Sequence, residues 1–169
     1  RSVQPLLALP GPPEVAADPG VRMVTIDDLD VYLPAAIDMF IGEVGVDPTA
    51  GDGGRSYRRR LASLINAQRV FARFDDGRVV FKAEIGSLSR RVGQIQGVWV
   101  APDRRGEGLG IAGTAAVAQA VKSHGRIPSL YVNSFNLTAR AAYERVGFTE
   151  VGTCLLYTSP RPRDRTRSR

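Results

Sequence analysis

The residue types best suited to chemistry gather in one glycine-rich segment of the chain. Two adjacent arginines, Arg104 and Arg105, are followed by glycines at three alternate positions, Gly106, Gly108 and Gly110. Glycine lets the main chain approach an anion closely, the first N–H groups of a helix attract negative charge, and a guanidinium adds a charge-assisted hydrogen bond. The segment therefore predicts a site for a phosphate or a pyrophosphate group.

Two other interpretations fit part of this segment. The simpler one is a plain turn between a strand and a helix, which leaves the paired arginines unexplained. The other is a dinucleotide-binding fold, because residues 108–113 satisfy the pattern G-x-G-x-x-G. In that fold the glycines follow their strand directly and an acidic residue comes about twenty positions later. Here seven residues separate Val100 from Gly108 and the next apolar run ends in Asn133, so a phosphate cradle is the better match.

The spacing of apolar residues predicts the elements that hold this segment. Leu29, Leu33 and Ile37 recur at helical spacing, and Asp76-Gly77 between two apolar runs indicates a β-hairpin. The expected strands cover about residues 21–25, 70–74, 78–84, 94–100, 129–132 and 148–152, and the expected helices about residues 27–43, 57–66, 108–122 and 137–146. An antiparallel meander followed by alternating strands and helices predicts an α/β fold with a mixed sheet and helices on both faces.

Two motifs, in this order, resemble those of one enzyme family. Residues 105–110 match the R-x-x-G-x-G signature of the GNAT N-acetyltransferases, and the V-x-V-x-P strand end usual in that family precedes them at residues 98–102. Residues 136–148 resemble the family's N-x-x-A-x-x-x-Y-E-x-x-G-F segment. The chain from residue 21 to 153 is therefore similar to a GNAT domain, and most of all to the C-terminal domain of two-domain actinobacterial members.

The resemblance implies the GNAT acyl-CoA N-acyltransferase fold, in which two central parallel strands splay apart and the pantetheine arm of acetyl-CoA lies between them. Acetyl-CoA is then the cosubstrate, held by the main chain of the first splayed strand and by the turn into the helix. The residues expected to bind it are Val98, Trp99, Val100, Arg105, Gly106, Glu107, Gly108, Leu109, Gly110 and Asn136. Asn136 is also a good N-cap for the helix that follows it.

The resemblance also implies catalytic roles. Tyr143 resembles the family tyrosine that lies beside the sulfur and protonates it; the other interpretation is a tyrosine that only packs on its helix. Many members take the proton of the amine with a glutamate on the strand before the turn, but this strand offers Gln94 and Gln96, which cannot act as bases. Glu84 on the neighbouring strand is the best nearby carboxylate, although a salt bridge there, or a chain of water molecules as the proton acceptor, fits equally well.

Acetyl transfer of this kind is direct, from the thioester to the amine, without a metal or a covalent enzyme intermediate. We expect no metal site, because the chain holds one histidine, His124, and one cysteine, Cys154. His124 is interpreted as a structural residue at a helix end. The alternative function is a non-catalytic acyl-CoA-binding or sensing domain, which the missing strand glutamate favours.

The chain divides into three parts of different composition. Within residues 1–20, an apolar run at residues 3–9 predicts the last strand of an upstream domain. The proline and glycine residues that follow it predict a linker. Residues 21–153 are expected to form the GNAT domain, without the last strand that family members normally have. Residues 154–169 resemble the translation of a sequencing adapter and are interpreted as an artefactual basic tail, with a natural disordered tail as the alternative.

Charge and hydropathy limit the partners. Five arginines and one aspartate after residue 153 carry +4 of the formal charge of +6, which leaves +2 for the rest and argues against a nucleic-acid partner. No apolar run is long enough to cross a membrane, so we expect a cytoplasmic protein. The expected acceptor is a small-molecule or peptide amine, and Glu43, Asp47 and Asp52 are expected to favour a cationic one. A homodimer is left open.

Overall fold

One seven-stranded sheet forms the centre of the structure, a computed structural model that describes residues 2–156 and the side chains of residues 4–152. The strands are β1 (Ser2–Ala8), β2 (Val21–Met23), β3 (Val70–Asp75), β4 (Arg78–Leu88), β5 (Val92–Val100), β6 (Ile127–Tyr131) and β7 (Thr149–Leu156), and the helices are α1 (Leu29–Val44), α2 (Arg55–Asn66), α3 (Leu109–Ser123) and α4 (Leu137–Val146). The order across the sheet is β2-β3-β4-β5-β6-β1-β7. Strands β5 and β6 are parallel and the other described pairs are antiparallel, which confirms the expected mixed sheet.

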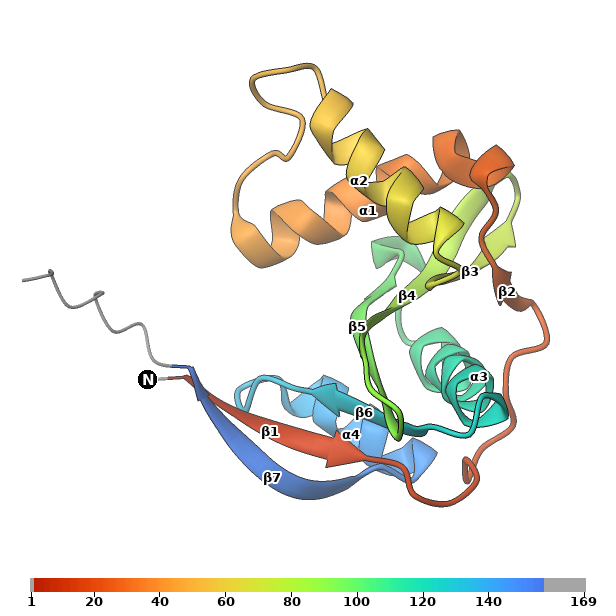
Figure 1. The fold of residues 1–169 in the computed structure, drawn as a ribbon, viewed down its shortest axis with the longest axis vertical. Coiled ribbons are helices and arrows are strands. Elements are labelled where there is room, and N and C mark those ends of the chain that lie inside the picture. Colours follow the sequence, from red (N-terminus) through yellow and green to blue (C-terminus); the bar gives the residue numbers. More distant parts are fainter. Residues whose placement is uncertain (1, 157–169) are drawn as a thin grey trace, which may run out of the picture.

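Helices cover both faces of the sheet (Figure 1). Alternate side chains of a strand point to opposite faces, and β3 shows the result: Val70 and Ala72 pack with α1 and α2, whereas Phe71 packs with α3. The two larger apolar cores form in this way, one on each side of β3 and β4. Among the helices described here, none is both long and apolar enough to pass through a membrane.

The hairpin between β3 and β4 forms where the sequence indicates it. Asp76 and Gly77 both have positive φ, 50° and 73°, as the tight turn of a two-residue hairpin requires. The strand that leaves this turn, β4, is buried on both faces over most of its length. Phe81 faces the α3 core, while Lys82 and Glu84 are buried on the opposite face, toward α1.

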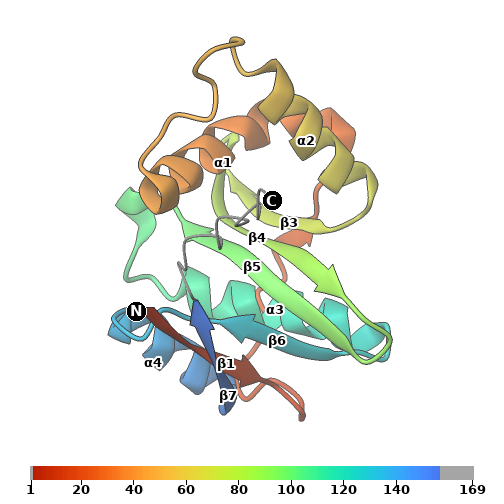
Figure 2. The same cartoon turned by 60° about the vertical axis from the view of Figure 1, so that its left-hand side comes forward.

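The N-terminal strand β1 lies inside the sheet, between β6 and β7 and antiparallel to both (Figure 2). The strand predicted at residues 3–9 is therefore present, but it pairs with strands of this domain. The segment after it is also packed and is not a loose linker, since the buried carboxylate of Asp18 accepts hydrogen bonds from Arg73 and from the N–H of Gly20. Residues 2–20, which we expected to be the last strand of an upstream domain and then a linker, pair with or pack on the strands of this domain.

The C-terminal strand β7 extends to Leu156. Residues 154–156, which we assigned to the artefactual tail, thus continue the sheet and pair with β1. The remainder of that tail lies outside the described residues.

Helix α3 approaches β4 closely at Gly113. A methyl group on Gly113 would lie 2.7 Å from ring carbons of Phe81, which is itself fully buried. Such a distance is well inside van der Waals contact, so only glycine fits this position without a shift of the core. The last glycine of the 108–113 pattern therefore serves the packing of α3 on β4.

We expect Gly113→Ala to lower the free energy of unfolding by about 1–3 kcal/mol, because the added methyl overpacks the core against Phe81. Gly42→Ala is the matched control: Gly42 is also helical, but no atom lies within 4 Å of the position its methyl would take. The control should gain up to about 1 kcal/mol from helix propensity. Chemical denaturation measures both changes, and equal stability of the two variants would contradict the packing argument.

Candidate active site

The two parallel strands, β5 and β6, pair over a short stretch and then separate. Their pairing runs from Val92 with Ile127 to Gln94 with Ser129. Beyond this point β6 stays paired with β1, while β5 continues to Val100 and, among residues 2–156, has no strand partner on the β6 side. Figure 1 shows β5 turning toward α1 as β6 runs on beside β1. The splayed pair that the resemblance implied is present.

A β-bulge lies in β5 just after the strands separate. The register with β4 shifts between the pairs Lys82–Trp99 and Glu84–Gln96, so β5 holds one residue more than β4 over this stretch. Gly97 has a φ of 61° at the bulge, a conformation that glycine adopts without strain. Sequence reasoning missed this feature, although a glycine inside an apolar strand pattern is a signal for it.

A groove of about 750 Å³ extends from β5 to the start of α3 and along α4. Its lining includes Val98, Val100, Arg105, Gly106, Gly108, Leu109, Gly110, Asn136, Ala139 and Tyr143. Gly108 precedes α3 with a φ of 81° and no side chain caps this helix, so its first N–H groups are left for a ligand. A methyl group at Gly106 or Gly108 would meet no atom within 4 Å, which shows that the turn has space above it.

The paired arginines have different surroundings. Arg104 is held by Asp75 at 2.8 Å and by Glu107 at 2.9 Å, so it orders the turn. Arg105 is exposed, and its Nε donates to the carbonyl of Val100 at 3.3 Å. Arg105 is therefore the better placed of the two to reach an anion in the groove.

A second pocket, the fork pocket, lies between the separated ends of β5 and β6 and has a volume of about 820 Å³. Its lining includes Gly42, Glu43, Gln96, Gly97, Val98, Tyr131, Val132, Asn133, Phe135, Asn136, Ala139 and Tyr143. Val98, Asn136, Ala139 and Tyr143 also line the groove. The groove and the fork pocket therefore adjoin, and Tyr143 lies at their junction.

Proteins of known structure share this fold. Residues 80–156 match the family model described as FR47-like protein. A GNAT-family acetyltransferase from Colwellia psychrerythraea has a TM-score of 0.69 at 14% identity, over 88% of this chain and 52% of its own. A second one, from Novosphingobium aromaticivorans, has a TM-score of 0.63 at 23% identity, over 90% of this chain and 63% of its own. The fold is that of the GNAT acetyltransferases.

A third structure with the GNAT fold is a predicted acetyltransferase with acetyl-CoA from Clostridium acetobutylicum. Its TM-score is 0.60 at 14% identity, over 78% of this chain and 90% of its own. The present chain spans about half of the Colwellia protein and less than two thirds of the Novosphingobium protein. No curated protein sequence matches the chain significantly.

Two of the residues expected to bind the coenzyme, Trp99 and Glu107, are not among those that line the groove of this GNAT fold. Trp99 points to the other face of β5, where its indole N–H donates to Asp38 of α1 at 2.9 Å. Glu107 is bound to Arg104. The other expected residues line the groove, and Asn136 also caps α4, because its Oδ1 accepts from the N–H of Ala139 at 3.0 Å.

Tyr143 has a phenol whose proton is firmly held. Burial raises its pKa to about 12, and the negative charge of Glu43 adds to the shift. The ring packs edge-on against Phe148, with 6.2 Å between the ring centroids. At neutral pH the hydroxyl is thus protonated, at the junction of the two cavities.

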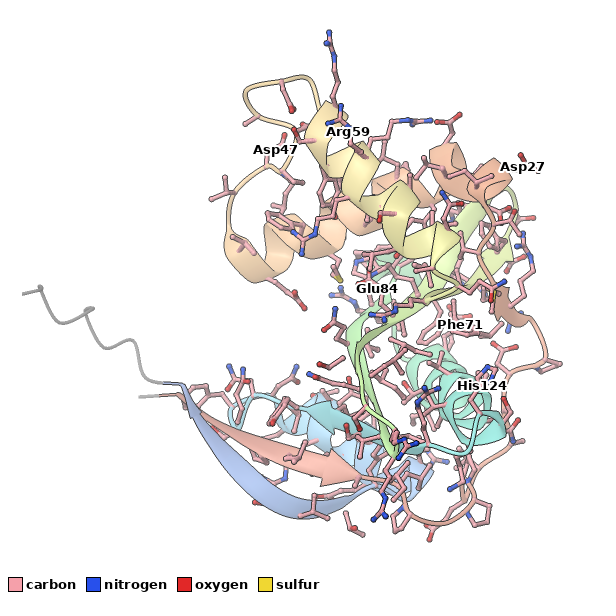
Figure 3. The ribbon with its side chains drawn as sticks, in the orientation of Figure 1. Asp27, Asp47, Arg59, Phe71, Glu84 and His124 are labelled. Atoms are coloured by element: carbon pink, nitrogen blue, oxygen red, sulfur yellow. The ribbon has the colours of Figure 1, made fainter. Side chains whose placement is uncertain are left out.

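The acidic residues singled out in the sequence separate into three environments. Glu43 lines the fork pocket. Asp47 accepts hydrogen bonds from Thr49 within the loop after α1, and Asp52, in the same loop, accepts from Ser56 in the first turn of α2. Figure 3 shows Asp47 out on this loop and Glu84 deep beneath α1.

Glu84 is held by two buried partners. Its Oε1 lies 3.3 Å from Nζ of Lys82 and accepts a hydrogen bond from the hydroxyl of Tyr32 at 3.2 Å. It is not among the residues that line the fork pocket. Glu43 is therefore the carboxylate of the set with direct access to that pocket.

His124 lies at the end of α3, on the other side of the sheet from α1 (Figure 3). It does not line the groove or the fork pocket. Among the residues that the structure describes, no three histidine, cysteine, aspartate or glutamate side chains come together as a metal site requires.

We expect Glu43→Gln to lower the pKa of Tyr143 from about 12. Removing the nearby negative charge makes the phenolate easier to form, so the pKa moves toward its ordinary value. Asp47→Asn is the matched control, and it should leave the pKa unchanged because the charge of Asp47 is not among the causes that raise the pKa of Tyr143. NMR titration of ring-labelled tyrosines, assigned with Tyr143→Phe, measures the shift. The same pKa in wild type and Glu43→Gln would contradict the proximity of the two groups.

Proposed function

We propose that the protein is an N-acetyltransferase that moves an acetyl group from acetyl-CoA to a primary amine of a small molecule or peptide, by direct attack. The observation that carries this proposal is the junction of two cavities between separated parallel strands. One cavity suits a long phosphate-bearing cosubstrate and the other suits an acceptor. A protonated tyrosine lies where they meet.

The groove fits acetyl-CoA. The uncapped start of α3 offers N–H groups to the pyrophosphate, with Arg105 beside them. The free edge of β5 from Val98 to Val100 offers main-chain groups to the amides of pantetheine, as a sheet edge does to an added strand. The bound acetyl-CoA of the Clostridium acetyltransferase, which has the same fold, supports this assignment.

The chemistry forms a C–N bond, breaks the C–S bond, and moves a proton from nitrogen to sulfur. The amine nitrogen attacks the thioester carbon, the C–N bond forms, and the C–S bond breaks as sulfur takes the electron pair. Tyr143, whose hydroxyl is protonated at neutral pH, donates its proton to the departing sulfur. A cationic amine loses one proton to the acceptor side of the site before it attacks, and a second proton, lost after the attack, restores the tyrosine. The net products are an amide, free coenzyme A and one released proton.

Glu43 is the residue proposed to attract the amine and collect its proton. Its carboxylate lines the fork pocket, whereas Glu84, expected in this role from the sequence, is occupied by Lys82 and Tyr32. A single carboxylate beside the acceptor favours a cationic amine. Because acetyl-CoA is the proposed cosubstrate, the cytoplasm is the proposed location.

A second candidate function is binding of acyl-CoA without turnover. It is favoured by Gln96, which lines the fork pocket where a glutamate would act as a base. Both candidate functions use the groove to bind acyl-CoA. They differ in whether the fork pocket supports transfer to an amine. Binding of acetyl-CoA with no product over a broad panel of amines would establish it.

We expect Gly108→Glu to abolish binding of acetyl-CoA in calorimetric titration. A carboxylate at the entrance of α3 repels the pyrophosphate and fills the space above the turn. Gly125→Glu is the matched control. Gly125 has a φ of 74°, close to the 81° of Gly108, and open space at its Cβ position, but it lies at the other end of α3. The control should bind normally; loss of binding in both variants would instead indicate backbone strain.

We expect Tyr143→Phe to lower kcat by a factor of about 10² to 10⁴, because the departing sulfur loses its proton donor. The Kd for acetyl-CoA should stay close to the wild-type value, since the ring and its contact with Phe148 remain. Steady-state kinetics and calorimetry measure the two quantities. An unchanged kcat would leave Tyr143 with a packing role alone.

A further inference from the structure

A buried ionic network lies directly behind the wall of the fork pocket. Lys82 is fully buried, and Glu84, two residues further along β4, is 7% exposed. Their charged groups are 3.3 Å apart, and Tyr32 of α1 donates a hydrogen bond to Glu84. Two charges removed from water cost more free energy than apolar residues in the same place, so this network calls for an explanation beyond stability.

The contacts of Lys82 point to the bulge. Its Nζ donates to the carbonyl of Gly97 at 2.8 Å and lies 3.1 Å from Sδ of Met39 in α1. The Cβ position of Gly97 is 3.1 Å from the same Nζ. Lys82 thus contacts the bulged main chain of β5 and the helix that carries Glu43.

The register between β4 and β5 places Lys82 and Glu84 beside the candidate active site. Lys82 pairs with Trp99 and Glu84 pairs with Gln96, so the two charges stand opposite the two ends of the bulge. Between these ends lie Gly97 and Val98, and Val98 lines both the groove and the fork pocket. A shift of the bulge therefore moves the main chain that faces the junction of the two cavities.

We propose that Lys82 is a positioning residue: by holding the carbonyl of Gly97, it sets the bulge of β5 and with it the main chain beside the acetyl group. Glu84 supplies the counter-charge that makes a buried ammonium tolerable, and Tyr32 fixes Glu84 to α1. This role rests on the proposed acetyl transfer for its effect on rate. The effect on the conformation of β5 does not depend on that function.

The test uses a charge-neutral double variant, Lys82→Met with Glu84→Gln. Lys82→Met alone leaves Glu84 as a buried charge without its counter-ion and is expected to unfold at a lower temperature. The double variant removes both charges and should regain stability, but it still lacks the donor to Gly97. We expect its kcat to remain about 10²-fold below wild type, with the KM for acetyl-CoA nearly unchanged.

Lys122→Met is the matched control. Nζ of Lys122 also donates to main-chain carbonyls, those of Leu9 and Pro10, away from the fork. It should keep the wild-type kcat. A double variant that is stable and has the wild-type kcat overturns the proposal, because the network then serves folding alone.

A second measurement keeps the proposal separate from the proposed function. Amide hydrogen exchange of Val98 and Trp99 should become faster in the double variant, while the amides of the β3–β4 hairpin at Gly77 should not change. If the wild type shows no acetyl transfer with any amine tested, the proposed function fails and exchange alone decides. Unchanged exchange at Val98 and Trp99 overturns the positioning role in either case.

Discussion

The site depends on the loss of pairing between β5 and β6 after Gln94. Unpaired main-chain groups in a folded interior cost free energy, so a sheet opens only where other contacts hold the strands apart. Here β6 keeps its pairing with β1, and the bulge at Gly97 bends β5 toward α1. The free edge of β5 is then a place where a ligand with its own amides replaces the missing strand.

The groove and the fork pocket have opposite charge preferences. At the groove, the start of α3 and Arg105 favour an anion, while Arg104 is used to hold the turn through Asp75 and Glu107. In the fork pocket, Glu43 is the exposed carboxylate. In the proposed reaction, the phosphate-bearing cosubstrate lies in the groove, the acceptor amine lies in the fork pocket, and the two meet near Tyr143, whose pKa is raised by burial and by Glu43.

The site is maintained at some expense of stability. An opened sheet and the buried pair of Lys82 and Glu84 both oppose folding. The apolar cores on the two faces of the sheet offset this loss of stability. Phe81 and its neighbours pack under α3, and Tyr32 of α1 and Leu61 of α2 pack together on the opposite face. Close approach at Gly113 lets α3 pack on Phe81 of β4, and the start of the same helix borders the groove.

Local features of this protein were determined by the sequence itself. The glycines and arginines of the turn into α3, the Asp76-Gly77 hairpin and the Asn136 cap act over a few residues, so their spacing was enough to predict them. Tertiary structure decided which strands flank β1 and that Trp99 faces α1. It also decided that Glu84 is bound to Lys82 and Tyr32, whereas Glu43 lines the fork pocket. These outcomes depend on segments far apart in the chain and on a one-residue bulge in β5, and a shift of one residue changes the face to which each later side chain of a strand points.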